Sequence, residues 1–187
     1  MSAGRKKQDP LDVYDTPEDA VLPILNEIAM WRHGSNLKRL HMKETAILEP
    51  CAGSGAILSL LRDRNHAAIG WDIAPQAEGV CAVDFLAIDL PPCFDLIITN
   101  PPFSKAQEII DKARSLLLPD GMAVMLLRLA YLESQTRAEW WKAWMPERIY
   151  VLSKRPSFTG KGTDSAAYAW FVWRNGPRFE SSDLRLL

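Results

Sequence analysis

The amino-acid sequence predicts an α/β fold with a doubly wound, mostly parallel sheet and helices on both of its faces. Two observations carry this prediction. From residue 45 onward, short apolar segments of strand length alternate with amphipathic segments of helix length, as expected where helices connect parallel strands. The final apolar segment departs from the alternation, because only residues 153–164 separate it from the strand before it and leave no room for a helix.

Local signals place the individual elements. We expect a helix after Thr16, with that residue as its N-cap and Pro17 at the first helical position. Strands are expected at 45–49, 67–72, 80–84, 94–99, 122–129, 147–152 and 165–174. Helices are expected between them at 55–64, 105–118 and 135–144. Because residues 165–174 are apolar on both faces, this seventh strand should lie antiparallel inside the sheet.

Length and composition indicate one domain. The chain has 187 residues and three cysteines, which form no Cys-x-x-Cys pair, so we expect neither a disulfide framework nor a metal site. We expect a disordered basic tail at 1–12 and a single domain at 13–187. The N-terminus lacks the apolar stretch of a signal peptide and no apolar run is long enough to span a membrane, which predicts a cytoplasmic protein.

The charge is unevenly distributed along the chain. Residues 1–121 hold 12 basic and 17 acidic side chains, whereas residues 122–187 hold 10 and 6. This asymmetry fits a polyanionic partner that approaches one side of the molecule. Ordinary scatter among surface charges is the favoured explanation of these counts, so charge alone leaves the partner open.

The first predicted strand ends in a glycine-containing turn. Gly53 and Gly55 would let a ligand approach the backbone at the carboxyl end of the strand, where open α/β sheets bind ligands. The segment is neither a dinucleotide fingerprint nor a phosphate-binding P-loop. Glu49, immediately before the turn, would repel a pyrophosphate and suits a cationic ligand. A tight structural turn is the alternative interpretation.

Acidic residues also end the next two predicted strands. Asp72 is well placed to accept hydrogen bonds from the two hydroxyls of a ribose. Asp84 ends the third strand beside the aromatic Phe85. Each acid alone is more often a helix cap or a solvated loop residue, but three acid-bearing strand ends in succession indicate a binding site for a nucleoside-containing ligand.

The fourth predicted strand runs into the turn Asn100-Pro101-Pro102-Phe103. Each proline disfavours the α conformation of the residue before it, so the pair predicts a rigid, extended turn. Such a turn would present the Asn100 amide oxygen and the Pro101 carbonyl as fixed acceptors, with an aromatic ring close by. Two acceptors and a ring suit a planar group that bears an amine.

These motifs together resemble the class I S-adenosylmethionine-dependent methyltransferases, and within them the amino-methyltransferases with an (Asp/Asn)-Pro-Pro-aromatic motif. The resemblance spans roughly residues 12–174, and the order of the motifs is similar to the gamma arrangement of DNA amino-methyltransferases. The upstream Tyr14-Asp15-Thr16-Pro17 is similar to a segment of compact phage adenine-N6 enzymes. The resemblance implies S-adenosylmethionine as cofactor, bound by Tyr14, Thr16, Glu49, Pro50, Cys51, Ala52, Gly53, Gly55, Asp72, Ile73, Asp84, Phe85 and Asn100.

The resemblance implies methyl transfer to the N6 amine of a flipped adenine in DNA, with S-adenosylhomocysteine as the second product. Asn100 and Pro101 would accept the two amine hydrogens, which favours a pyramidal, nucleophilic nitrogen, and Phe103 would stack on the base. The basic loop before the last strand would contact nucleic acid. Its candidate substrate-binding residues are Lys154, Arg155, Phe158 and Lys161.

Several alternatives remain at the level of the sequence. We expect a monomer or a homodimer and no separate target-recognition domain, which departs from the usual gamma enzymes. The serious competitor for DNA is RNA, methylated at adenine N6 or guanine N2. A protein-glutamine methyltransferase and a non-catalytic nucleic-acid-binding subunit are weaker alternatives, the second because both the glycine turn and the Asn100 turn are intact. The Trp-rich stretches at 140–144 and 170–173 are expected to belong to the core.

Overall fold

A computed structural model describes residues 15–34, 45–64, 67–158, 160, 162–176 and 182–187. Tyr14, Lys161 and the expected tail at 1–12 lie outside the described residues. Within the described part, no helix is long and apolar enough to cross a membrane, and no cluster of three or more histidine, cysteine or acidic side chains could hold a metal ion.

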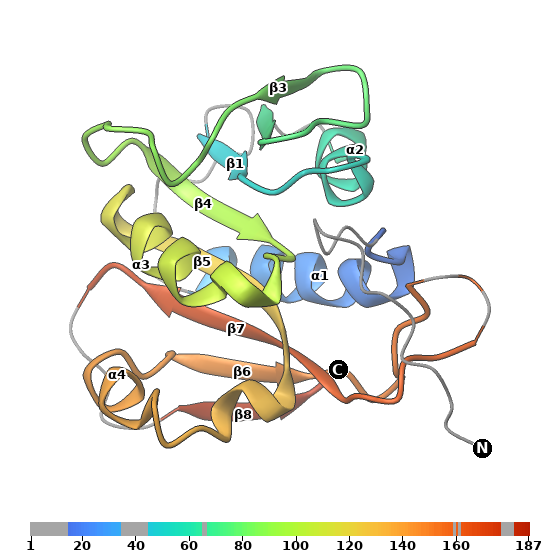
Figure 1. Cartoon of the computed structure of the whole chain (residues 1–187), viewed down its shortest axis with the longest axis vertical. Coiled ribbons are helices and arrows are strands. Elements are labelled where there is room, and N and C mark those ends of the chain that lie inside the picture. Colours follow the sequence, from blue (N-terminus) through green and yellow to red (C-terminus); the bar gives the residue numbers. More distant parts are fainter. Residues whose placement is uncertain (1–14, 35–44, 65–66, 159, 161, 177–181) are drawn as a thin grey trace, which may run out of the picture.

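One mixed sheet organises the fold (Figure 1). Its strand order is β3-β2-β1-β4-β5-β7-β6-β8, and β7 runs antiparallel to both of its neighbours. The predicted fold class and the internal antiparallel strand are therefore confirmed. The strands are β1 (Ile47–Glu49), β2 (Ala68–Asp72), β3 (Val80–Ala82), β4 (Phe94–Thr99), β5 (Leu117–Arg128), β6 (Arg148–Val151), β7 (Tyr168–Arg174) and β8 (Asp183–Leu186).

The sheet has one strand more than the seven that the sequence predicts. Strand β8 pairs in parallel with β6 at the edge of the sheet, and all four of its residues are exposed. The segment alternates polar and apolar residues, but it contains no β-branched or aromatic side chain, so the sequence marks it only weakly as a strand. Its position is therefore set by hydrogen bonds to β6 and not by a hydrophobic pattern.

Helices cover both faces of the sheet, which gives three layers and confirms that part of the prediction (Figure 1). On one face, α1 and α2 pack against a core that includes Val124 and Trp170. On the other face, α3 and the buried Trp141 of α4 pack against Ala123 and Phe171. The helices are α1 (Glu18–Gly34), α2 (Ala56–Asp63), α3 (Ala106–Ser115) and α4 (Ala138–Ala143), with 3₁₀ turns η1 (Phe103–Lys105) and η2 (Leu129–Leu132).

Strand β5 begins where the sequence predicts the end of a helix. Helix α3 ends at Ser115, and β5 starts at Leu117 rather than at residue 122. The Asn175 side chain, just beyond β7, donates to the carbonyls of Leu117 and Leu118. The boundary thus depends on a contact between segments 58 residues apart, which a local pattern does not contain.

The first helix begins one residue later than predicted, at Glu18, and the Pro17 carbonyl accepts a hydrogen bond from the Ala20 N–H at 3.0 Å. The indole N–H of Trp170 donates to the Ala20 carbonyl at 2.7 Å, so the start of α1 is tied to the centre of the sheet. Trp141, Trp170 and Trp173 are buried, whereas Trp140 and Trp144 are half-buried. The prediction that the Trp-rich stretches belong to the core is therefore confirmed for 170–173 and only in part for 140–144.

Candidate active site

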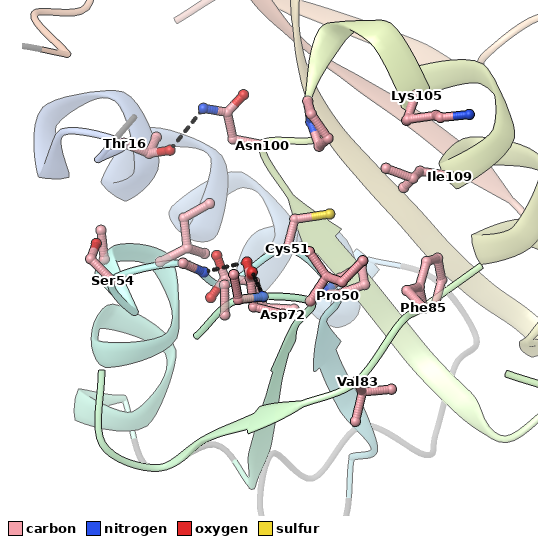
Figure 2. Close-up of a pocket in the computed structure, with 18 of the residues that line it drawn as sticks. Thr16, Pro50, Cys51, Ser54, Asp72, Val83, Phe85, Asn100, Lys105 and Ile109 are labelled. Atoms are coloured by element: carbon pink, nitrogen blue, oxygen red, sulfur yellow. Dashed lines mark hydrogen bonds between the residues drawn. The ribbon is translucent and has the colours of Figure 1, made fainter. Parts of the chain in front are cut away.

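A cleft lies at the carboxyl ends of β1, β2 and β4, where the sequence predicts ligand binding. It encloses about 170 Å³ and is open to solvent. In Figure 2, Thr16 and Asn100 lie on one side of the cleft, and Val83 and Phe85 lie on the opposite side. The predicted residues that line it are Thr16, Glu49, Pro50, Cys51, Ala52, Gly53, Asp72, Ile73, Asp84, Phe85, Asn100 and Pro102.

The turn between β1 and α2 is held in a fixed shape by backbone hydrogen bonds. Gly53 and Gly55 have φ values of 49° and 79°, in the left-handed region that glycine adopts without strain. The Gly55 N–H donates to the Ala52 carbonyl at 2.6 Å, and the Ala52 N–H donates to the Trp71 carbonyl at 2.8 Å. Both glycines therefore meet a conformational requirement, which agrees with the alternative interpretation of a tight structural turn, and hydrogen bonds fasten this turn to β2.

Asp72 ends β2 and connects two loops of the cleft (Figure 2). Its Oδ2 accepts the Gly53 N–H at 2.7 Å, and its Oδ1 accepts the Ala74 N–H at 2.8 Å. Each carboxylate oxygen has further lone-pair capacity, so the side chain can accept hydroxyl hydrogens from a ligand while it keeps both backbone contacts.

Beyond Asp72, the cleft is lined by aromatic, apolar and acidic side chains. The Phe85 ring is buried, with its centroid 6.5 Å from that of Trp71, whereas the Ile73 side chain is 67% exposed on the cleft lining. Asp84 is exposed and accepts the Leu86 N–H with Oδ1 at 3.0 Å. An exposed apolar side chain beside an exposed carboxylate offers a ring contact and an acceptor to the same planar ligand.

Glu49 is a buried acid on the lining of the cleft. Its side chain is 2% exposed, and its Oε2 has no hydrogen-bond partner within the described part of the chain. Burial, with the nearby Asp72 charge as a smaller contribution, raises the pKa of Glu49 well above the usual value of 4.5. A buried carboxyl with one unsatisfied oxygen gains most from a cationic ligand, which would supply both a donor and a compensating charge.

Cys51 lies on the same lining, between Glu49 and the glycine turn. Burial and the negative charge of Asp72 raise the pKa of the Cys51 thiol to about 12. The sulfur is therefore a neutral thiol at physiological pH and acts as a small apolar wall of the cleft instead of a nucleophile.

The Asn100 turn has the extended form that its prolines predict. Pro102 has φ −58° and ψ 131°, and η1 begins directly after it at Phe103. The Asn100 amide nitrogen donates to the Thr16 hydroxyl oxygen at 3.2 Å across 84 residues of sequence (Figure 2). This contact directs the amide nitrogen toward Thr16, so the amide oxygen of this cleft-lining residue remains available as an acceptor.

A second contact joins the segment before α1 to the glycine turn. The Ser54 hydroxyl donates to the Asp15 carboxylate, and both residues line the cleft. Asp15 and Ser54 are functional candidates that sequence reasoning missed. Their signal was present, because each neighbours a residue that the motifs single out.

The remaining predicted residues among those described, including Gly55 and the buried Pro101, are not on the cleft lining. Phe103 contacts the apolar core of the α1 face. Lys154 forms an exposed ion pair with Asp19 at 2.6 Å. The Phe158 ring packs against Tyr168 with centroids 5.0 Å apart, and Arg155 is exposed.

The fold has many counterparts among solved structures. A protein from Listeria monocytogenes assigned to the class I S-adenosylmethionine-dependent methyltransferases aligns with a TM-score of 0.70 at 14% identity, over 98% of this chain and 68% of that one. The chain has the fold of class I methyltransferases. No family model matches the sequence, and no curated protein matches it.

Two further neighbours share the fold. The 1,6-didemethyltoxoflavin-N1-methyltransferase of Burkholderia thailandensis, solved with S-adenosylhomocysteine, aligns with a TM-score of 0.55 at 14% identity, over 86% of this chain and 80% of that one. The M protein of the type I restriction enzyme EcoKI aligns with a TM-score of 0.55 at 16% identity, over 72% of this chain and 40% of that one.

Proposed function

We propose that the chain is an S-adenosylmethionine-dependent methyltransferase that acts on the N6 amine of adenine in DNA. The observation that carries the proposal is the Asn100–Thr16 hydrogen bond at 3.2 Å. This hydrogen bond leaves the Asn100 amide oxygen free to accept from a substrate amine. The same cleft carries Glu49, which suits a cationic group, and Asp72 and Asp84, which suit a nucleoside. Two neighbours in fold, one solved with S-adenosylhomocysteine, support the choice of cofactor.

The residues of the cleft fit S-adenosylmethionine. The unpaired Oε2 of Glu49 suits the ammonium group of the methionine portion. Asp72 retains acceptor capacity for the ribose hydroxyls, and Ile73 and Asp84 suit the adenine. The bound cofactor supplies an electrophilic methyl group on a sulfonium, and the transfer leaves S-adenosylhomocysteine.

The Asn100 turn would hold the amine that receives the methyl group. The Asn100 amide oxygen and the Pro101 carbonyl accept its two hydrogens, which draws the nitrogen lone pair out of the ring and toward the methyl carbon. The bound cofactor would supply the methyl group to this nitrogen, and the surplus proton on nitrogen would pass to solvent. Fixed acceptors and positioning supply the rate acceleration, so no strong base is needed.

Two observations favour DNA as the source of the amine. The EcoKI M protein belongs to a restriction enzyme, and restriction enzymes act on DNA. The loop between β6 and β7 places Lys154 and Arg155 on the surface, where cations contact phosphates. Adenine in a duplex would have to leave the base stack, at a cost of a few kcal/mol, and an RNA base is the competing substrate.

The test uses radiolabelled S-adenosylmethionine with the purified protein and three polymers in parallel: unmethylated duplex DNA, single-stranded DNA and total RNA. The labelled polymer is digested and its nucleosides are separated by mass. Label in N6-methyldeoxyadenosine supports the proposal, and label only in RNA transfers the activity to the competing substrate. A protein that binds the cofactor but labels none of the three polymers would contradict a nucleic-acid methyltransferase.

A further inference from the structure

Five side chains form a cluster at the end of the Asn100 turn, and among them only Phe103 and Phe158 have a role expected from the sequence. We call Phe103, Arg128, Phe158, Asp164 and Tyr168 the Arg128 cluster. The Arg128 guanidinium carbon lies 4.3 Å from the centroid of the Phe103 ring. The Tyr168 ring lies between the other two rings, with centroids 6.3 Å from Phe103 and 5.0 Å from Phe158.

Strand register explains why the cluster meets the turn. Strands β4 and β5 are parallel, with Thr99 opposite Met125, so β5 continues to Arg128 alongside the residues that follow β4. Strand β7 is antiparallel to β5 and places Tyr168 directly opposite Arg128. The two side chains therefore project on the same face of the sheet, at the end where the proposed substrate binds.

Polar contacts fix the orientation of the guanidinium. The Arg128 Nε–H donates to the Tyr168 hydroxyl at 3.1 Å, and that hydroxyl donates to the Asp164 Oδ2 at 2.9 Å. The Arg128 Nη2 lies 4.0 Å from the same carboxylate oxygen. Asp164 is itself held by the Ala166 N–H at 3.0 Å, so the arrangement ties the loop before β7 to the end of β5.

The protonation states agree with this geometry. Burial raises the pKa of Tyr168 to about 12, so its hydroxyl keeps the proton that it donates. Burial also raises the pKa of Asp164, but the hydrogen bonds from Ala166 and Tyr168 and the Arg128 charge outweigh that effect and leave it below its usual value. The cluster is therefore a cation paired with an anion through a neutral phenol at neutral pH.

We propose that Arg128, held by Tyr168 and Asp164, is a positioning residue that fixes the Phe103 ring for stacking on the target base. The inference rests on the proposed function. The guanidinium covers one face of the ring, so a base has to use the opposite face or the edge, which restricts its orientation relative to Asn100. A planar guanidinium stacks on an aromatic ring in a way that a lysine ammonium does not reproduce.

The test compares Arg128→Met and Arg128→Lys with Arg114→Met. Arg114 is a matched control because its guanidinium carbon also lies 3.7 Å from an aromatic ring centroid, that of Trp144, and it is not on the cleft lining. For each variant we would measure kcat and KM with DNA, the cofactor dissociation constant by calorimetry, and the midpoint of thermal unfolding.

We expect Arg128→Met to lower kcat about tenfold with a cofactor dissociation constant within about twofold of wild type, because misplacement of a reacting group reduces rate more than binding. Arg128→Lys should recover only part of kcat, and Arg114→Met should leave kcat unchanged. Tyr168→Phe, which keeps the ring and removes the hydroxyl, should lower kcat by a smaller factor in the same direction.

The outcomes separate the two proposals. If the wild-type protein methylates DNA and Arg128→Met retains its kcat, the positioning role is wrong while the proposed function stands. The role is also wrong if Arg128→Met lowers the unfolding midpoint and cofactor binding together, with unchanged kcat per bound cofactor. If the wild-type protein methylates no nucleic acid, both proposals fail.

Discussion

The two sides of the cleft are formed by different kinds of chain segment. The proposed cofactor side uses backbone amides and carboxylates from one continuous stretch, residues 49–86, in which the Gly53 N–H and Asp72 meet at 2.7 Å. The proposed substrate side is assembled from distant segments, such as Thr16 and Asn100, which are 84 residues apart. The comparison predicts that variants on one side impair cofactor binding, whereas variants on the other impair transfer.

The largest expected effect belongs to the substrate side. Asn100→Ala removes the amide oxygen that would polarise the amine, and we expect kcat to fall by about 100-fold or more, as for the loss of a preorganised catalytic hydrogen bond. The cofactor dissociation constant, measured by calorimetry, should remain within about threefold of wild type.

A second, milder variant on the same side of the cleft tests this prediction further. Thr16→Val removes the acceptor that orients the Asn100 amide but leaves the amide itself, so kcat should fall by a smaller factor, about tenfold. If Asn100→Ala instead abolished cofactor binding, the amine site would be misplaced and the division of the cleft would be wrong.

The next effect belongs to the cofactor side. Asp72→Asn replaces one carboxylate oxygen by an NH₂ group, which faces the backbone N–H of Gly53 or Ala74 and cannot accept either of them. We expect cofactor binding to weaken about tenfold or more, since the charge and one acceptor are lost. At saturating cofactor, kcat should be close to wild type.

Asp63→Asn is the matched control for Asp72→Asn. Asp63 is an exposed carboxylate at the end of α2 and does not line the cleft. Equal cofactor affinities for the Asp72 variant and wild type would remove the ribose contact from the proposal, whatever the variant did to kcat.

The buried acid predicts a pH dependence. Burial raises the pKa of Glu49, so part of the ligand-free protein carries a neutral carboxyl above pH 4.5, whereas a cationic ligand favours the carboxylate. Cofactor affinity should therefore rise with pH through the raised pKa, with proton release visible in calorimetry in buffers of different ionisation enthalpy. Glu49→Gln should bind more weakly at high pH and lose the dependence on Glu49 ionisation.

The stability of the ligand-free protein should fall with rising pH, whereas cofactor affinity should rise. A folded-state pKa above the unfolded value makes the ligand-free wild type lose stability as pH rises from about 4.5 through the raised pKa. Glu49→Gln removes this loss, so its unfolding midpoint relative to wild type should increase with pH. A relative midpoint that is constant with pH would show that the carboxyl is ionised in the ligand-free protein.

The contrast between the continuous cofactor side and the assembled substrate side explains which parts of the site could be predicted from the sequence. The acid-bearing strand ends and the glycine turn were predicted from the sequence, because each lies at a fixed offset from an apolar strand, and the structure brings Glu49, Asp72 and Asp84 to one cleft. Phe103 and Phe158 of the Arg128 cluster were predicted to bind substrate, but their association with Arg128 was not, because only the pairing of β5 with β7 brings Arg128 opposite Tyr168. Strand register over a separation of 40 residues has no local signal.

The role of Thr16 in the structure differs from the role that the sequence predicts. Its position before an acidic helical turn predicts an N-cap, which is a local role. In the structure its hydroxyl accepts the Asn100 amide N–H instead, and the side chain is buried. The N-cap prediction for Thr16 is therefore wrong, because α1 begins only at Glu18 and the partner of the hydroxyl comes from the tertiary fold.

The smallest expected effect concerns the basic loop. Lys154 and Asp19 form an ion pair at 2.6 Å with side chains 75% and 51% exposed, so Lys154→Ala should change the free energy of unfolding by less than about 1 kcal/mol. Lys142→Ala is the matched control, because Lys142 pairs with Glu139 at 2.7 Å and is 72% exposed, on α4 instead of the loop.

DNA binding distinguishes the two lysines. If Lys154 contacts a phosphate, Lys154→Ala should weaken binding at low salt by a few fold and reduce the slope of log affinity against log salt by about one, whereas Lys142→Ala should change neither. The measurement is a salt titration of DNA affinity for both variants. Equal slopes would leave Lys154 with its ion pair to Asp19 as its whole role, and the substrate side of the cleft would then depend on the Asn100 turn and the Arg128 cluster.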